Sequence, residues 1–269
     1  MRPKKTSPPG LLLPIVTLAR REIVRFFRQR NRVTGALLQP LIFWLLFGAA
    51  FKASFKAPEG SEGMSYQEYF FPGTIVMILL FTAIFSTISI IEDRKEGFLQ
   101  SVLVAPISQL GMVLGKIMGG TLLAMIQGFL FLLLAFSLKI PLTPTVFLEA
   151  LGIMFLIAFS LTGLGFIIAW RMDSTQGFHA IMSVFLLPMW LLSGALFPAA
   201  GVPAWLGWLI AVNPLTYGLA AFRHVLYADR IMVGLPSFAV SLGVTVLFCL
   251  ATTLGATLIA RVRTTGDLH

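Results

Sequence analysis

The segment from Ser193 to Arg223, SGALFPAAGVPAWLGWLIAVNPLTYGLAAFR, most constrains what this chain can fold into. It is too apolar for a loop in water and too broken for one membrane-spanning helix, because each proline removes a backbone donor and clashes with the preceding turn. The pattern predicts two short helices, one starting at Pro203 and one capped by Asn213 and started by Pro214.

These two helices, near residues 203–211 and 214–227, are both too short to cross a hydrocarbon core of about 30 Å. A break in a helix at membrane depth is tolerated only where protein or water satisfies the freed backbone groups. The segment therefore predicts a membrane protein with a crevice, and a re-entrant helical hairpin at residues 203–227.

The composition excludes an ordinary soluble domain. Apolar residues make up 57% of the 269 residues, the mean hydropathy is +0.90, and soluble domains contain about 45–50% apolar residues. Only 12% of the residues are charged, which favours one integral membrane domain over residues 11–269. The net charge of +9 comes from basic residues that flank apolar runs, so anionic lipid headgroups are the expected partner and nucleic acid is not. The single Cys249 excludes an intrachain disulfide framework.

The N-terminal region predicts a basic, disordered tail at residues 1–10 and an amphipathic helix at residues 11–32. One face of this helix is apolar and the other is basic. The apolar face comprises Ile15, Val16, Ala19, Ile23, Phe26 and Phe27, and the basic face comprises Arg20, Arg21, Arg25 and Arg28. Such a helix lies in the membrane interface, and the alternative is an ordinary soluble amphipathic helix.

Six apolar segments follow and predict an all-α fold with six transmembrane helices, the hairpin lying between the fifth and the sixth. The spans are expected near residues 33–51, 70–91, 113–138, 146–170, 178–197 and 237–260. With the N-terminus inside, fifteen Lys and Arg residues lie on the cytoplasmic side and five outside. This bias predicts cytoplasmic termini and an outer position for the hairpin.

The connection EDRKEGFLQSVLVAPIS, from Glu92 to Ser108, begins with five charged residues and continues with apolar residues at helical spacing. The pattern predicts an amphipathic helix at residues 92–104 that presents a docking surface for a soluble partner. A solvated interfacial loop is the alternative.

Two motifs resemble those of ABC-2 type transporter permeases. The run EDRKEGFLQSVLVAPISQLGMVLGK resembles the cytoplasmic segment after the second span, and LSGALFPAAGVPAWLGWLIAVNPLTYGLAAFRHVL resembles the outer hallmark of the same family. The motifs lie in the expected order on a chain with the expected number of spans, and the likeness extends from the N-terminal helix to the sixth span.

The resemblance implies an exporter subunit in the plasma (bacterial inner) membrane that works as a homodimer, or with a second permease, above two copies of a cytoplasmic ABC ATPase. It implies a coupling helix that contacts the ATPase through Glu92, Asp93, Arg94, Lys95, Glu96, Leu99 and Leu103. It implies an outer gate built from Pro203, Trp205, Asn213, Pro214, Thr216, Tyr217 and Arg223. Many relatives carry an acidic residue before the last of these positions, whereas this chain has Ala220 and Ala221. Arg223 is therefore expected to reach the outer headgroups.

The chain itself is not expected to be an ATPase. The run GMVLGK at Gly111–Lys116 superficially resembles a Walker A loop, but it is one residue short and has Ile117 where Ser or Thr binds magnesium. Gly111, Gly115 and Gly119 instead predict a small-residue face for close helix packing. No cofactor is expected on this chain, and ATP and Mg²⁺ are expected on the partner subunit.

Catalytic residues are not indicated, because His179, His224 and His269 are scattered and have no partners at metal-ligand spacing. Gln39, Gln127 and Glu149 are the polar residues closest to the spans. They are candidates for a substrate path, and the alternative is that they lie between helices or at headgroup level.

The expected function is export of a hydrophobic or amphiphilic cargo, such as a drug-like compound or a lipid, because the spans lack charged groups that would select a charged solute. A lipid-linked oligosaccharide is the alternative cargo. An ion-coupled secondary transporter would also use broken helices, but it predicts intramembrane carboxylates and an inverted repeat, and the sequence shows neither.

Overall fold

The computed structural model describes residues 10–28, 30–55, 57, 63–105, 107–198, 202–228, 230 and 234–261, and for residues 30–37 and 103 it describes the backbone alone. The expected tail, residues 1–10, falls outside these ranges except for its last residue. Every regular element within them is a helix, so the expected all-α class is confirmed.

The helices follow one another along the chain with short connections. They are α1 (Leu12–Arg28), α2 (Arg30–Ala50), α3 (Tyr66–Ser86), α4 (Ile88–Lys95), α5 (Phe98–Val104), α6 (Gln109–Leu132), the 3₁₀ helix η1 (Leu133–Leu138), α7 (Pro144–Trp170), α8 (Thr175–Trp190), the π-helical turn η2 (Leu191–Ala195), α9 (Ala204–Val212), α10 (Pro214–Leu226) and α11 (Phe238–Ala260).

Most of the long helices start at a polar side chain that caps the first free backbone N–H groups. These caps are Ser65 for α3, Ser108 for α6, Thr143 for α7, Ser174 for α8, Asn213 for α10 and Ser237 for α11. At Ser65 the reciprocal bond from Glu68 completes a capping box. The expected start of α10, with Asn213 as the cap and Pro214 as the first helical residue, is confirmed.

Five helical stretches are long and apolar enough to cross a membrane, namely Tyr66–Lys95, Gln109–Leu138, Pro144–Trp170, Thr175–Ala195 and Phe238–Ala260. They correspond to the second to sixth expected spans. The bent pair α9 and α10 is, taken together, also long and apolar enough to cross a membrane as one broken span. The expected first span corresponds to α2, in which Leu38–Ala50, the part with described side chains, is a shorter apolar helix. The described residues therefore give five or six candidate spans.

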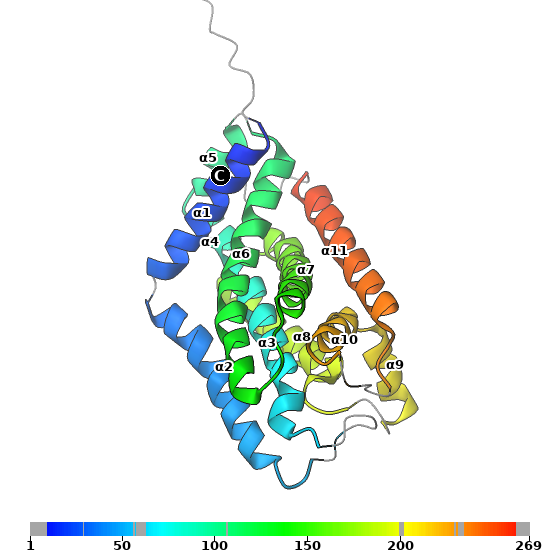
Figure 1. Ribbon diagram of the computed structural model, residues 1–269. Helices are drawn as coiled ribbons and strands as arrows, with labels where there is room; N and C mark the ends of the chain where they lie inside the picture. The colour runs from blue at the N-terminus through cyan, green and yellow to red at the C-terminus, as the bar shows by residue number, and fades with distance from the viewer. Residues whose placement is uncertain are drawn as a thin grey trace, which may run out of the picture.

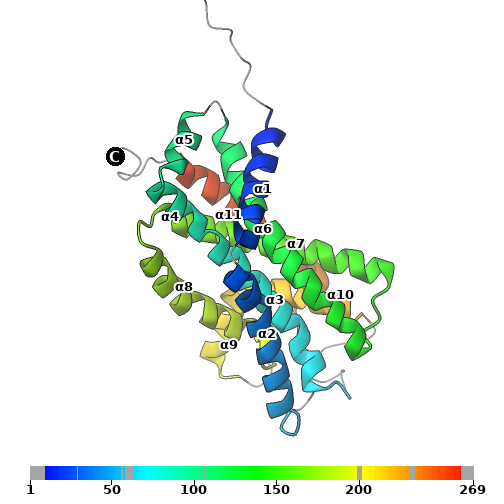
Figure 2. The same ribbon diagram turned by 90° about the vertical axis from the view of Figure 1, so that its left-hand side faces the viewer.

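The spans form a bundle whose two ends differ (Figure 1). Helices α1, α4 and α5 gather at one end, called here the α5 end, and α9 lies toward the opposite end, called the α9 end; Figure 2 shows the same division from the side. The stretch Tyr66–Lys95, which contains α3 and α4, is central, with 78% of its most apolar part buried, whereas α11 lies at an edge with 17% buried. The bundle thus surrounds α3, which links the two ends.

Helix α1 packs against the glycine face of α6. A Cβ atom built on Gly115 would lie 2.9 Å from the Cβ of Leu18, and one built on Gly119 would lie 2.8 Å from the Cβ of Glu22. Real Cβ atoms do not approach so closely, so only glycine allows this contact. The expected small-residue face is confirmed, and it brings α1 close enough for its charged residues to reach into the bundle.

The packed face of α1 differs from the expected apolar face. Pro14, Leu18, Ala19 and Glu22 are buried, whereas Val16 and Phe27 remain exposed. The buried face thus combines small and apolar residues with one carboxylate.

Candidate functional site: a charge cluster and a broken helix at opposite ends

The expected single helix over residues 92–104 is divided in two. Gly97 adopts a left-handed conformation (φ 74°), which glycine adopts without strain, and it separates α4 from α5. Glu92, Asp93, Arg94 and Lys95 therefore belong to α4, which continues the direction of the α3 span, and only the residues after Gly97 form a separate short helix.

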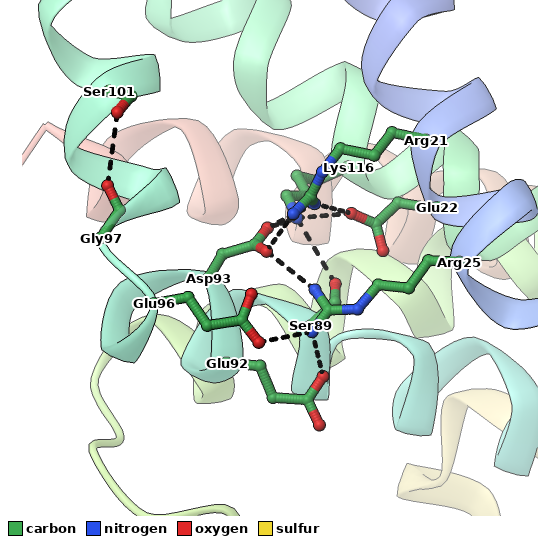
Figure 3. Close-up of polar contacts among 10 residues, drawn as sticks. All are labelled: Arg21, Glu22, Arg25, Ser89, Glu92, Asp93, Glu96, Gly97, Ser101 and Lys116. Atoms are coloured by element: carbon green, nitrogen blue, oxygen red, sulfur yellow. Dashed lines mark hydrogen bonds and ion pairs between the residues drawn. The ribbon is translucent and has the colours of Figure 1, made fainter. Parts of the chain in front are cut away.

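Asp93 is fully buried and is the centre of a charge cluster that comprises Arg21, Glu22, Arg25, Asp93 and Lys116 (Figure 3). One carboxylate oxygen accepts from Arg21 at 2.7 Å and from Arg25 at 2.8 Å. The other accepts from Arg21 at 2.9 Å and from Lys116. Three cations thus share one carboxylate, and charged hydrogen bonds of this kind are the strong ones.

Lys116 also binds Glu22, with 2.5 Å between Nζ and Oε1, and both side chains are at most 5% exposed. The lysine of the GMVLGK run is therefore held by two carboxylates within the bundle, which agrees with helix packing as the role of this run. The cluster joins α1, α4 and α6, and the guanidinium of Arg21 also lies 3.7 Å from the ring centre of Phe98 in α5.

The charges of the cluster raise the pKa of Arg21. Burial by itself would lower the pKa of Arg21, but the hydrogen bond to Asp93 and the attraction of the nearby carboxylates outweigh burial and raise it. The positive charge is thus fixed at this position.

Sequence reasoning placed Arg21 and Arg25 on an outward basic face and missed Glu22 and Lys116 as partners. A signal was present, because Glu22 is the only acidic residue of α1 and Lys116 the only charged residue of α6. A charge that is buried requires a partner, but the sequence does not show that Glu22 is buried or that α1 and α6 meet.

Arg94, the neighbour of Asp93, points to the other side of α4 and binds the end of α7. It donates to the carbonyl of Trp170 at 2.6 Å and to the carbonyl of Met172 at 3.1 Å, and it lies 3.4 Å from the carboxylate of Asp173. A cation is favoured at a helix C-terminus, where carbonyl groups lack partners. Arg94 therefore binds α4 to the end of α7 and to the loop that leads from α7 to α8.

The remaining residues of the expected coupling helix differ in accessibility. Glu92 and Glu96 bind Arg25 at 2.9 and 3.2 Å, and Glu96 is 59% exposed. Lys95 is exposed, Leu99 is buried, and the side chain of Leu103 lies outside the described residues. Asp93 and Arg94 are buried within the chain, so the part of the expected coupling helix that remains accessible consists of Lys95, Glu96 and the outer face of α5.

At the opposite end, α9 and α10 occupy the expected positions and meet at 79°. Asn213 lies in the bend, where its side chain accepts from the N–H of Leu215 and donates to the carbonyl of Met189 at 2.6 Å. Thr216 and Tyr217 donate to the carbonyls of Ile210 and Ala211 in the last turn of α9. Two of the carbonyls freed by the break are thus satisfied by side chains of α10.

The expected position of Arg223 is wrong. Its side chain does not reach the surface but is buried, with 3% exposed, and donates to the carbonyl of Gly194 at 2.9 Å. Its guanidinium lies 4.2 Å from the ring centre of Tyr69. The end of α8, where the π-helical turn exposes carbonyl groups, supplies the partner that α10 itself lacks.

The other gate residues lie around this break. Pro203 precedes α9, and Pro214 is the first residue of α10. Trp205 is 66% exposed on α9.

The three candidates for a substrate path do not come together. Gln39 and Glu149 are exposed on α2 and α7. Gln127 is buried between α6 and α3 and accepts from the hydroxyl of Thr82 at 2.8 Å, while its Nε2 finds no acceptor within the described part of the chain. Among the described residues, no group of three His, Cys, Asp or Glu side chains could hold a metal ion.

Comparison with known proteins agrees with this architecture. Residues 14–227 match the family model of the ABC-2 type transporter, and the chain belongs to this family. A protein of Cyanophora paradoxa named as transport permease ycf38 is 29% identical over 215 residues, which cover 78% of this chain and 73% of the relative. The homologue of Porphyra purpurea is 27% identical over 220 residues, covering 80% and 74%.

A bacterial relative from Escherichia coli strain K12, named as multidrug ABC transporter permease YbhR, is 27% identical over 171 residues, which cover 63% of this chain and 46% of the relative. As a member of the ABC-2 family, the chain is an integral membrane protein and a transmembrane permease of an ABC transporter. Permeases of this family generally work with an ABC ATPase subunit.

Proposed function

We propose that the chain is the permease subunit of an ATP-driven exporter in which α4 passes the movement of the ATPase on to the spans. The α5 end is the cytoplasmic end in this proposal, and the ATPase binds the surface formed by Lys95, Glu96 and α5. ATP and Mg²⁺ are bound by the ATPase alone.

The position of α4 is the observation that carries this proposal. Two adjacent residues of α4 are tied to different parts of the bundle, Asp93 to α1 and α6, and Arg94 to the end of α7. A displacement of α4 therefore acts at once on helix α1 and on the spans that contain α6 and α7. Tightly packed elements transmit such shifts as rigid bodies, so a push at the exposed surface changes the tilt of the bundle.

The proposed cargo is hydrophobic or amphiphilic, such as a drug-like compound or a lipid. The buried charges near the α5 end are engaged with one another, and Arg223 is the one buried charge among the described residues at the α9 end. The buried polar groups between the two ends, such as Gln127 and Thr82, are neutral. This chemistry favours an apolar solute. The bacterial relative's name, which includes multidrug transport, supports the drug-like class, and a lipid-linked oligosaccharide is the second candidate.

An ion-coupled secondary transporter is disfavoured by the same contacts. Coupling to protons or sodium needs a carboxylate that is free to bind the ion. The two most deeply buried carboxylates among the described residues, Glu22 and Asp93, are both bound by cations.

One six-helix subunit supplies half of a pathway, so the proposal includes a homodimer, or a pair with a second permease, above two ATPase copies in the plasma (bacterial inner) membrane. The α9 and α10 pair then lies on the outer side and forms the exit gate. The positive charge of the connections at the α5 end supports this orientation.

Arg94→Met tests the coupling role. The substitution removes the charged hydrogen bonds to the end of α7 but leaves the exposed surface of α5 unchanged. We expect the variant to co-purify with the ABC ATPase while the stimulation of ATP hydrolysis by the permease in lipid vesicles falls about tenfold, as expected for the loss of a hydrogen bond to a charged group.

Arg171→Met is the matched control, because Arg171 is an exposed arginine on the same connection. It should retain the stimulation of the unmodified protein, and both variants should elute as the unmodified protein does in size-exclusion chromatography. Equal stimulation by Arg94→Met and the unmodified permease would show that α4 does not carry the coupling.

A further inference from the structure

In the turn η2 at the end of α8, the carbonyl group of Gly194 accepts hydrogen bonds from two other helices. Gly194 adopts a left-handed conformation (φ 82°) and turns its carbonyl toward the bundle. This carbonyl accepts from the hydroxyl of Tyr69 at 2.8 Å and from the guanidinium of Arg223 at 2.9 Å. The carbonyl of Gly194, in the turn η2 that follows α8, is thus bound from two sides, by α3 and by α10.

The two donors differ in what their burial costs. Tyr69 is neutral and places its ring in the apolar core. Arg223 carries a charge that forms no ion pair with any carboxylate in the described part of the chain, and its Nε is buried without an acceptor. On the same helix, Ala220 lies about one turn before Arg223 and is buried, so it supplies no carboxylate.

Arg223 also donates to the backbone carbonyl of Tyr69 at 3.4 Å. A buried cation without a carboxylate opposes the packed state, because water solvates a guanidinium better than these two carbonyl groups and the ring of Tyr69 do. Opening the end of α8 would hydrate Arg223. The closed arrangement therefore contains one group that favours closure, the hydroxyl of Tyr69, and one whose charge favours opening.

The neighbouring contacts hold the same segment without charge. The hydroxyl of Tyr66 donates to the carbonyl of Leu196 at 3.0 Å, and the indole N–H of Trp190 donates to the carbonyl of Gly73 at 2.8 Å. Arg223 is therefore the one charged group that binds the end of α8 in the described residues.

We propose that Arg223 is a positioning residue whose buried charge drives the end of α8 to open, and that Tyr69 opposes it by holding the carbonyl of Gly194. The two residues set the closed and open populations of a two-state element. The inference rests on the proposed function only in assigning this element to the exit gate.

The test measures opening directly and needs no ATPase. Cys249 is the only cysteine of the chain. In a Cys249→Ala background, Ser193→Cys places a thiol at a position next to Gly194 that is 3% exposed. The rate at which a charged methanethiosulfonate reacts with this thiol, in the full chain reconstituted in lipid vesicles, reports how often the segment opens.

Tyr69→Phe should raise this rate about 3- to 10-fold, because one neutral hydrogen bond that favours closure is lost. Arg223→Met should lower it about tenfold or more, because replacing an uncompensated charge by an apolar side chain of similar length stabilises the packed state. Arg223→Lys keeps the charge but loses the planar set of donors, so the rate should equal or exceed that of the unmodified residue.

Arg230→Met is the matched control. Arg230 is an exposed arginine at the same end, 3.7 Å from Glu68, and its loss should leave the rate unchanged. A residue that merely supports the fold would give faster reaction in both Arg223 variants. An increase with Arg223→Met, or no change in any variant, overturns the inference. The rate is independent of ATP, so a failure of the coupling role would not alter these results.

Discussion

Asp93→Asn should be among the most destabilising single substitutions in this chain. The fully buried carboxylate binds Arg21, Arg25 and Lys116, and removing its charge leaves three cations close together with fewer acceptors. Breaking a buried ion pair from one side costs about 3–5 kcal/mol, because the remaining charge stays buried. We expect a loss of this size in the free energy of unfolding, measured by circular dichroism during denaturant titration in detergent.

Glu96→Gln is the control for this result. Glu96 binds the same Arg25 at 3.2 Å but is 59% exposed, so water screens the pair and its loss should cost less than about 1 kcal/mol. If Asp93→Asn also lowered the free energy of unfolding by less than about 1 kcal/mol, the cluster would not hold α1, α4 and α6 together.

Reversing the charge of Lys116 should have an effect of similar size, and a second reversal should restore part of it. Lys116→Glu places a third carboxylate beside Glu22 and Asp93, so like charges replace two short ion pairs. Adding Glu22→Lys restores an opposite pair across the α1–α6 contact and returns a cation to the vicinity of Asp93.

The expected signature is non-additivity. The double variant should be more stable than Lys116→Glu alone, and the coupling energy between the two positions should reach about 2 kcal/mol, within the range found for contacting residues. Lys116→Met removes the charge without adding repulsion and should lie between Lys116→Glu and the unmodified protein. Additive losses in the double variant would contradict direct contact between Glu22 and Lys116.

The spans and the broken segment could be predicted because their signals are local. An apolar run specifies a membrane helix by its length, and Asn213 followed by Pro214 specifies a helix start by its own chemistry. The glycine face of α6 was readable for the same reason, since its spacing of four residues lies along one helix.

The charge cluster could not be predicted, because its partners lie far apart in the sequence. Asp93 and Arg21 are separated by 72 positions, and a charged run beside a membrane span is also typical of a solvated loop. Asp93 and Arg94 are neighbours, yet they point to α1 and α7 on different sides of α4. Gly97 was the local signal that the run would not be one helix.

Arg223 was misplaced for a related reason. The sequence shows that its own helix lacks a carboxylate, and reaching the headgroups was the remaining local solution. The partner is instead the backbone carbonyl of Gly194, which lies within the π-helical turn η2. A backbone acceptor of this kind cannot be recognised in the sequence, because every residue carries a backbone carbonyl.

The most direct test of the account asks which end of the bundle contacts the ABC ATPase. Val104 of α5 is 85% exposed and Trp205 of α9 is 66% exposed, so a cysteine at either position, in the Cys249→Ala background, is accessible to a thiol-to-amine cross-linker. The complex with the ABC ATPase should cross-link through Val104→Cys and not through Trp205→Cys. Cross-linking through Trp205→Cys, or none through Val104→Cys in an intact complex, would contradict the account.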